Sequence, residues 1–317
     1  MQVKKPFLTY EEQLKKLRDK GLIISDETHA KDILTQVGYF SLINGYKLPF
    51  KDTSTGQYKK GATFEDIENL YNFDEALREL FFKYLLKVEQ KLKSHISYYF
   101  SEKHGNSIDA YSSLHNYDYK DTKKVQDIFK LLGEINRVIT SNFNAVNLNH
   151  YIISHENIPL WVLTRKLTFG NVSKMLDILP IQLQTKISKN YSNLIKTTQL
   201  TAIISVLVLF RNTCAHNDRL YNYKSIKNEI PSLRLHKELN LKRLPDGNYA
   251  NGKQDLFAVV IALRYLLEED NFSQFFTKLE KIILEHPDNN VFPKNELIEN
   301  MGFPVNWQDV KKLPIKY

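Results

Sequence analysis

Apolar residues recur at intervals of three and four positions along most of the chain, which is the spacing of one helix face. The longest such stretch begins at Thr63 and stops before Gly105. Its apolar stripe runs through Leu70, Phe73, Leu77, Phe81, Leu85, Val88, Leu92, Ile96 and Tyr99. Strict alternation of apolar and polar residues, the pattern of a strand, is scarce. The pattern therefore predicts an all-α fold.

The N-terminal part has its own helix start and stop signals. Thr9 followed by Glu12 three residues later matches a capping box, and Gly21 is placed to end the helix that it opens. A second helix is expected to end at Gly38. We therefore expect residues 1–60 to form a small helical lead-in.

Several further helices are expected after the long one. They span about Lys120 to Thr140, Leu160 to Phe169 behind Pro159, a short segment that ends before Pro180, and Thr198 to Arg211. The run from Thr198 to Arg211 is apolar on nearly every side, which is typical of a central helix buried by its neighbours. We expect residues 61–223 to form a helical core around it.

The C-terminal part has a different pattern. Between Tyr221 and Lys253 the helical spacing lapses into a basic, Asn-rich connector, expected to be an exposed excursion. Helical spacing returns from Asp255 to Glu285, and a Pro-broken tail runs to Tyr317. Residues 224–317 are thus expected to form a connector, a long helix and a tail, a helical extension that packs on the core.

Charge and cysteine content narrow the class of protein. The chain has 44 Lys and Arg against 36 Asp and Glu, a formal charge of +8 that permits a polyanionic partner without requiring one. Its single cysteine, Cys214, excludes an internal disulfide and suits a reducing cytoplasm. No apolar stretch of signal-peptide length follows the N-terminus, and the run Ile203 to Phe210 is too short to cross a bilayer. We expect a cytoplasmic protein that does not contact a membrane.

Polar groups gather directly after the most apolar helix, between Phe210 and Asn222. Burying polar groups beside such a helix costs free energy unless they have a functional role or all have hydrogen-bond partners. At about 100° per residue, Asn212, His216 and Arg219 fall on one stripe, whereas Arg211 lies about 140° from His216. Arg211 and His216 can therefore converge only near a helix end or across an interface. An Arg-x4-His pair alone has little value as a motif, because on the order of one match is expected by chance in a chain of this composition.

The wider context of the pair is more specific. The segment Arg211 to Asn222 closely resembles the signature of the Abi-like abortive-infection family, which includes the AbiF and AbiD groups. Supporting stretches are Lys5 to Gln13, Gly38 to Tyr46, and Pro159 to Leu163 leading to Thr168, Phe169 and Gly170. The resemblance covers roughly residues 5–225.

The resemblance implies a HEPN-like helical bundle whose Arg-x4-6-His signature is associated with metal-independent RNA cleavage in a dimer. It also implies abortive-infection or toxin-antitoxin biology, in some members with a noncoding RNA antitoxin. On this basis we expect Arg211, His216 and Asn212 to be catalytic, in a homodimer that needs no cofactor. In one departure, family members often carry an acidic residue after the tryptophan, where this chain has Thr164, Arg165 and Lys166. A charge partner for Arg211 from that helix is therefore not expected.

The residue types suit RNA cleavage on chemical grounds. RNA carries its own nucleophile, the 2′-hydroxyl, so a site needs a base, an acid for the departing 5′-oxygen and a cation on the phosphate. His takes either proton role near neutral pH, and Arg holds a phosphate without losing its proton. Each chain supplies one suitable histidine, His216, so a complete site is expected to combine two chains.

Other roles for these residues stay open. Asn212 is expected to orient His216, bind phosphate or cap the helix, and Arg219 to pair with Asp218 or with a phosphate. The connector residues Lys224, Lys227 and Lys242 fit either an RNA phosphate track or a solvated loop. The aromatic group around Phe40, namely Tyr39, Phe40, Tyr46 and Phe50 with Lys47, fits either base stacking or a core. The alternative function is a catalytically inactive HEPN module that binds or senses RNA.

Three other chemistries are disfavoured. Cys214 lies about 200° from His216 around a helix, which argues against a Cys-His nucleophile. His150 and His155, expected in a loop, lack the further ligands of a zinc site. The stretch Gly56 to Gly61 lacks the Gly-Lys-Ser or Gly-Lys-Thr ending of a phosphate-binding loop.

Overall fold

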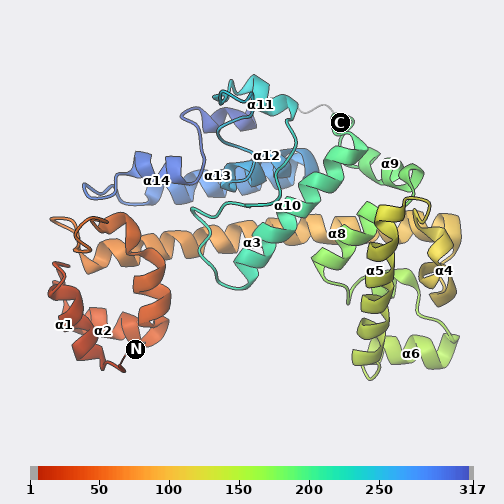
Figure 1. Cartoon of the computed structure of the whole chain (residues 1–317), viewed down its shortest axis with the longest axis horizontal. Coiled ribbons are helices and arrows are strands. Elements are labelled where there is room, and N and C mark those ends of the chain that lie inside the picture. Colours follow the sequence, from red (N-terminus) through yellow and green to blue (C-terminus); the bar gives the residue numbers. More distant parts are fainter. Residues whose placement is uncertain (1–5, 314–317) are drawn as a thin grey trace.

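The computed structural model describes residues 6–313, so the first five residues of the expected lead-in and the last four of the expected tail lie outside it. Figure 1 shows one long helix, α3 (Phe64–His104), running along the length of the molecule with the other elements distributed along it. Thr63 caps this helix with Asp66 in a capping box, and Gly105 follows its last turn. Its 41 residues span about 60 Å at 1.5 Å per residue. The longest predicted helix is thus confirmed at both ends.

The N-terminal elements pack at the start of α3 (Figure 1). They are α1 (Tyr10–Arg18), α2 (Glu27–Val37), the π-helix η1 (Phe40–Asn44) and the 3₁₀ turn η2 (Leu48–Phe50). The capping box of Thr9 and Glu12 forms as predicted, and Gly38 adopts a positive φ of 83° directly after α2. The sequence signals therefore placed both N-terminal helices correctly.

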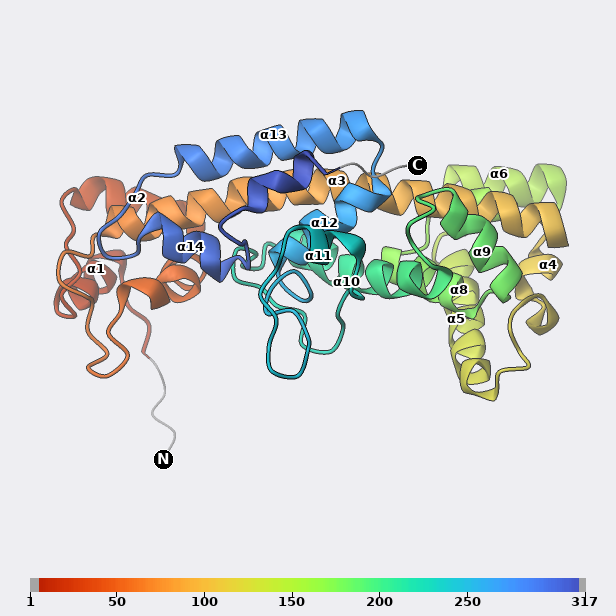
Figure 2. The same ribbon diagram turned by 90° about the horizontal axis from the view of Figure 1, so that it is seen from above.

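Short helices gather at the opposite end of α3 (Figures 1 and 2). They are α4 (Ile108–Ser112), η3 (Leu114–Asn116), α5 (Thr122–Ser141), α6 (Val146–His155), α7 (Leu160–Leu163), α8 (Phe169–Ile178) and α9 (Ile181–Lys189). The helix near Lys120 to Thr140 is confirmed as α5. His150 and His155 lie on α6, so their expected loop was wrong.

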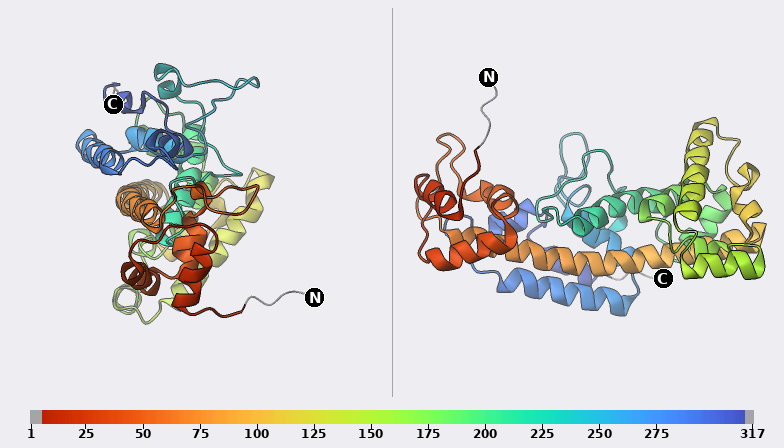
Figure 3. Two further views of the ribbon diagram at one scale, coloured as in Figure 1. Left: turned by 90° about the vertical axis from the view of Figure 1, so that its left-hand side faces the viewer. Right: turned by 90° about the horizontal axis from the view of Figure 1, so that it is seen from below.

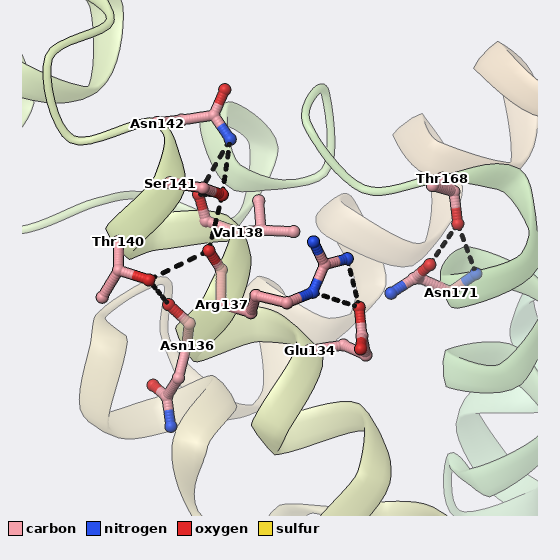
Figure 4. A network of polar contacts seen from close by, with 9 residues as sticks. All are labelled: Glu134, Asn136, Arg137, Val138, Thr140, Ser141, Asn142, Thr168 and Asn171. Atoms are coloured by element: carbon pink, nitrogen blue, oxygen red, sulfur yellow. Dashed lines mark hydrogen bonds and ion pairs between the residues drawn. The ribbon is translucent and has the colours of Figure 1, made fainter.

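The helix expected from Leu160 to Phe169 was also wrong. It stops at Leu163, and α8 begins at Phe169. The cause is local, because the Thr168 hydroxyl accepts a hydrogen bond from the backbone N–H of Asn171 at 3.1 Å and so caps a new helix (Figure 4). Gly170 therefore lies inside α8 rather than between two helices.

The helix α10 (Thr197–Ala215) crosses α3 near the middle of the molecule (Figure 1). It contacts α3, α8, α9 and α12, which confirms the predicted central helix. Of the helices that the structure describes, α10 is the one long and apolar enough to span a membrane by length and composition, a test that core helices of soluble proteins also pass. Its contacts on several sides are those of a core helix.

Among the C-terminal helices, the longest lies along α3 (Figures 2 and 3). The C-terminal helices are α11 (Arg234–Glu238), α12 (Leu256–Leu266), α13 (Glu269–Glu285), α14 (Lys294–Asn300) and the 3₁₀ turn η4 (Trp307–Lys311). The helix α13 runs antiparallel to α3. Its far end places His286 against Phe73 with ring centroids 4.7 Å apart, while Glu268 before its start pairs with Lys91.

Two expectations for this region need correction. The helical stretch from Asp255 to Glu285 is two helices, because the chain is extended at Leu267 and Glu268. The connector is not an excursion from the core, since apolar residues along it are buried. Those buried residues are Ile230, Leu233, Leu235, Leu239 and Leu241. Its lysines at positions 224, 227, 237 and 242 are exposed, whereas Lys253 at its end is buried. Between residues 6 and 313 extended pairing is limited to three isolated bridges, so the all-α prediction is confirmed.

Candidate active site

The polar segment begins where α10 ends. Ala215 is the last helical residue, His216 caps the helix, and Asn217 takes a left-handed conformation with a φ of 60°. The backbone N–H of Asp218 reaches the carbonyl of Thr213 at 3.0 Å, which completes a Schellman motif. Asparagine tolerates this conformation better than most residues do. The chain therefore turns sharply after His216 and leaves its side chain exposed.

Arg211 lies one turn earlier on α10 and faces α3. Its Nε donates to Oε2 of Glu89 at 3.2 Å, and its NH1 donates to the Asn212 side-chain oxygen at 3.2 Å. The other oxygen of Glu89 binds Lys93 at 2.7 Å. The Glu89 side chain is 5% exposed and that of Arg211 is 23% exposed. A nearly buried carboxylate thus bridges two cations and fixes the guanidinium.

Asn212 interacts with Arg211 through its side chain and with His216 through its backbone carbonyl, which accepts the His216 backbone N–H at 2.9 Å. Its side-chain oxygen accepts from Arg211, and among the described residues no hydrogen bond joins this side chain to the His216 ring, so orienting the imidazole stays a prediction. Phosphate binding also stays a prediction. Asn212 is thus a second hydrogen-bond partner of the Arg211 guanidinium, besides Glu89.

The two signature residues point to different sides of the helix end. Arg211 is held against Glu89 of α3, whereas His216 opens into a cleft on the other side. Within the part of the chain that the structure describes, no hydrogen bond or ion pair joins them. This divergence agrees with the 140° separation expected for an unbroken helix.

The cleft beside His216, which we call the His216 cleft, has a volume of about 540 Å³. One wall is the turn from His216 to Arg219. The facing wall comes from η1 and its flanks, with Phe40, Asn44 and Tyr46, and Tyr71 of α3 also lines it. The N-terminal helices and the turn after α10, far apart in the sequence, therefore form one cavity.

Asp74 of α3 holds this arrangement together. Its fully buried carboxylate accepts the backbone N–H groups of Leu220 and Tyr221, the Tyr46 hydroxyl at 2.7 Å and the Arg78 guanidinium at 2.6 Å. Burial raises the pKa of the Asp74 carboxyl, and the hydrogen bonds together with the charge of Arg78 oppose that rise. Four donors converging on one group indicate that it acts as a carboxylate. Asp74 thereby ties the turn after α10 to the N-terminal segment.

Arg219 has a partner that the sequence did not suggest. Its NH1 donates to the backbone carbonyl of Gly45 at 2.6 Å, and its guanidinium lies 5.9 Å from the centre of the Tyr221 ring. The expected pairing with Asp218 is therefore wrong. Arg219 instead links the two walls of the His216 cleft, and a contact with RNA phosphate stays a prediction.

Cys214 faces the interior. Burial raises the pKa of its thiol to about 12, which leaves it protonated and unreactive near neutral pH. Among residues 6–313, no group of three or more His, Cys, Asp or Glu side chains is placed to hold a metal ion.

The other residues named from the sequence lie elsewhere. Lys224, Lys227 and Lys242 are exposed on the connector, and Lys242 lines a separate cleft with Trp307. In the aromatic group around Phe40, Tyr46 and Phe50 are buried and Tyr39 is half-buried, so these three belong to the core. Phe40 is the exception, because 79% of it is exposed.

Glu89 and Asp74 are the site residues that the sequence analysis missed. Both occupy the apolar face of α3: Asp74 lies four residues after Leu70, and Glu89 lies four residues after Leu85. An acidic residue on a core-facing stripe is a signal for a buried interaction. The signal identifies the residue but not its partner, which lies 122 positions away for Glu89.

A comparison with known families agrees with the signature. The family model for Abi-like proteins matches residues 32–222, more than half of the chain. The chain belongs to the Abi-like family. The matched range contains the whole segment from Arg211 to Asn222, Glu89, Asp74 and the walls of the His216 cleft.

Membership in the Abi-like family suggests a role in abortive infection. The stretch from Lys5 to Gln13 lies outside the matched range, as do the connector from residue 223 onward and the C-terminal helices. No curated protein and no solved structure gives a significant match.

Proposed function

We propose that this Abi-like protein is a metal-independent endoribonuclease of the HEPN type that acts as a toxin in an abortive-infection or toxin-antitoxin system. The observation that supports the proposal is the contrast between the surroundings of Arg211 and those of His216 at the end of α10. Glu89 fixes the Arg211 guanidinium, while His216 stands exposed in a cleft. A preorganised cation and a solvent-accessible imidazole are two of the groups that cleavage of a phosphodiester uses.

The reaction uses the nucleophile that RNA itself carries. One imidazole takes the proton of the 2′-hydroxyl, the 2′-oxygen bonds to phosphorus, and the bond from phosphorus to the 5′-oxygen breaks. A second, protonated imidazole gives its proton to that 5′-oxygen. Arg211 holds the non-bridging oxygens of the phosphate. The products are a 2′,3′-cyclic phosphate and a 5′-hydroxyl, and no metal ion or cofactor takes part.

The second imidazole comes from a second chain in this proposal. Close to His216 the chain offers Asp218, Cys214 and Tyr221 as other titrating groups. The pKa of Cys214 is raised to about 12 by burial, and that of Tyr221 is also raised to about 12 by burial, so neither donates a proton readily near neutral pH. A homodimer with α10 ends facing each other supplies two His216 side chains and brings the Arg211 of one chain near the His216 of the other.

A second function, an RNA-binding or RNA-sensing module without catalysis, is favoured by one specific observation. The polar partners of Arg211 in the described chain are Glu89 and Asn212, which are those of a structural ion pair. In that case the protein binds RNA and leaves it intact.

The test is cleavage of RNA by purified protein in EDTA, with the His216→Ala variant beside it. Loss of a proton-transfer group lowers the rate by about 10²- to 10⁴-fold, and the fold should be intact because the side chain is exposed. His155→Ala is the matched control, since His155 is also exposed but lies on α6. Undiminished cleavage by His216→Ala would refute the assignment, and RNA binding without any cleavage by the wild type would favour the second function.

A further inference from the structure

Phe40 is placed unlike its neighbours in the N-terminal segment. Leu42 and Ile43, on the same short helix, are completely buried, whereas 79% of Phe40 is exposed. The helix η1 is a π-helix, a geometry that recurs at functional sites. Burial in the core therefore does not account for a phenylalanine at this position.

Phe40 and His216 line the same cleft. Tyr71 lines the cleft as well, and its ring is held at 5.4 Å from that of Tyr46 in an edge-to-face arrangement. A volume of about 540 Å³ falls within the range of small-molecule sites, which run to roughly 300–1,000 Å³, and accommodates a nucleotide. The ring of Phe40 is thus available to a ligand that also reaches the imidazole.

The polar groups around this cleft match the edges of a nucleobase. Gln36 and Asn217 carry amides, which pair with donor and acceptor groups of a base. Asn44 offers its amide N–H donors, since its oxygen accepts from Lys47, and Asp218 offers a carboxylate that accepts from an exocyclic amino group. All four residues line the cleft together with three aromatic residues. Aromatic stacking combined with side-chain hydrogen bonds is the way proteins recognise an unpaired base.

Positive charge continues beyond the cleft. A second cleft of about 500 Å³ shares Asn44 with the first and is lined by Lys16 and Lys20 of the N-terminal segment. An RNA strand with one base in the His216 cleft would pass close to these ammonium groups as it continues beyond the cleft. This charge favours a nucleic acid over an apolar or cationic occupant.

We propose that Phe40 stacks on an unpaired base of the RNA substrate next to the scissile phosphate, so that the His216 cleft selects single-stranded RNA. The inference rests on the proposed function for the identity of the substrate. It adds a specificity-determining residue outside the Arg-x4-His signature. Bases inside an A-form duplex are stacked on one another and do not offer a face to Phe40, so double-stranded RNA is excluded.

The experiment measures affinity for RNA in the His216→Ala background, where the RNA stays intact. Phe40→Ala should weaken binding of a single-stranded oligonucleotide by about five- to a hundred-fold, the range for loss of one stacked base. Phe40→Trp should keep the affinity, and its added fluorescence should be quenched by single-stranded but not double-stranded RNA. Phe129→Ala is the matched control, because Phe129 is a phenylalanine 58% exposed on α5.

A set of oligonucleotides, each with one abasic nucleotide at a different position, locates the stacked base. At the correct position the abasic substitution should weaken binding to the parent protein and leave binding to Phe40→Ala unchanged. Equal affinity of Phe40→Ala and its parent for intact single strands would overturn the proposal, as would an abasic effect of the same size in both proteins.

These experiments distinguish failure of the ribonuclease proposal from failure of the Phe40 stacking proposal. Stacking on Phe40 without cleavage by the wild type refutes the ribonuclease and leaves the RNA site in place. Cleavage by the wild type with no effect of Phe40→Ala on affinity refutes the site alone. A protein partner that Phe40→Ala releases, with RNA affinity unchanged, would assign the exposed ring to that partner and overturn the RNA site.

Discussion

Glu89 lies in the middle of α3 and Arg211 near the end of α10, and their side chains meet at 3.2 Å. Because the other Glu89 oxygen binds Lys93, removal of this carboxylate leaves two cations facing each other in a partly buried place. No charge partner for Arg211 was expected on the segment after the tryptophan, and α3 supplies one through Glu89. Glu89 is therefore a positioning residue for Arg211.

Glu89→Gln keeps the shape of the side chain and removes its charge. Loss of a hydrogen bond between charged groups lowers the free energy of unfolding by about 1.5–3 kcal/mol. Because Arg211 is then less firmly held, the single-turnover cleavage rate should also fall, while RNA affinity changes little. Thermal denaturation and single-turnover kinetics measure the two effects.

Glu134→Gln is the control for Glu89→Gln, since Glu134 pairs with Arg137 on an exposed face of α5 (Figure 4). Loss of a surface pair should cost less than about 1 kcal/mol. A Glu89→Gln protein that matches the wild type in stability and rate would show that the ion pair neither stabilises the fold nor positions Arg211.

The connector lysines test whether RNA extends beyond the cleft toward the C-terminal part. Lys224, Lys227 and Lys242 are exposed, so their combined replacement by Ala should leave the fold intact. If each contacts a phosphate, the slope of log affinity against log salt for single-stranded RNA falls by about 2 in total. Replacing Lys16 and Lys20 gives the comparison from the N-terminal cleft. An unchanged slope for the triple variant would show that the connector lysines do not contact RNA phosphates.

We expect the stability of the fold in acid to depend on His286. Burial, together with the charge of Lys294, lowers the pKa of this imidazole to about 4, whereas its ordinary value is 6.5. Between about pH 6.5 and pH 4 the unfolded chain binds a proton that the folded chain does not, so stability is lost as the pH falls through this window.

His286→Phe should flatten that loss, because the ring still packs on Phe73 but no longer titrates. Chemical denaturation of both proteins at several pH values measures the difference in unfolding free energy. Stability curves of wild type and variant that stay parallel between pH 6.5 and pH 4 would contradict the assignment. His236, whose pKa is also lowered by burial, remains in both proteins and cancels in the comparison.

Local signals explain which parts of the fold the sequence predicted. Thr9 and Thr63 cap their helices through residues three positions away, so the sequence itself contains the interaction that begins each helix. The break after Leu163 was missed although Thr168 carries a local cap, because the apolar spacing continues across it. Burial of the connector depends on distant packing and left no local signal.

One part of the candidate site could likewise be predicted from the sequence, and another part could not. The segment from Arg211 to Asn222 is contiguous and visible as a motif, and the angle between Arg211 and His216 follows from helix geometry alone. The pairing of Arg211 with Glu89 and the meeting of Phe40 with His216 in one cleft join segments more than a hundred residues apart. Such pairings are set by how the helices pack on α3, which a single sequence does not specify.

The shared catalytic site is tested most directly by mixing wild-type and His216→Ala chains in equal amounts and verifying subunit exchange. If each site needs the His216 of both chains, only wild-type homodimers cleave RNA, and random pairing leaves about one quarter of the activity of the same total amount of wild-type protein. The account predicts that one-quarter value, with heterodimers nearly inactive. Activity of about one half, in proportion to the wild-type chains present, would contradict the shared site and show that each chain carries an independent catalytic centre.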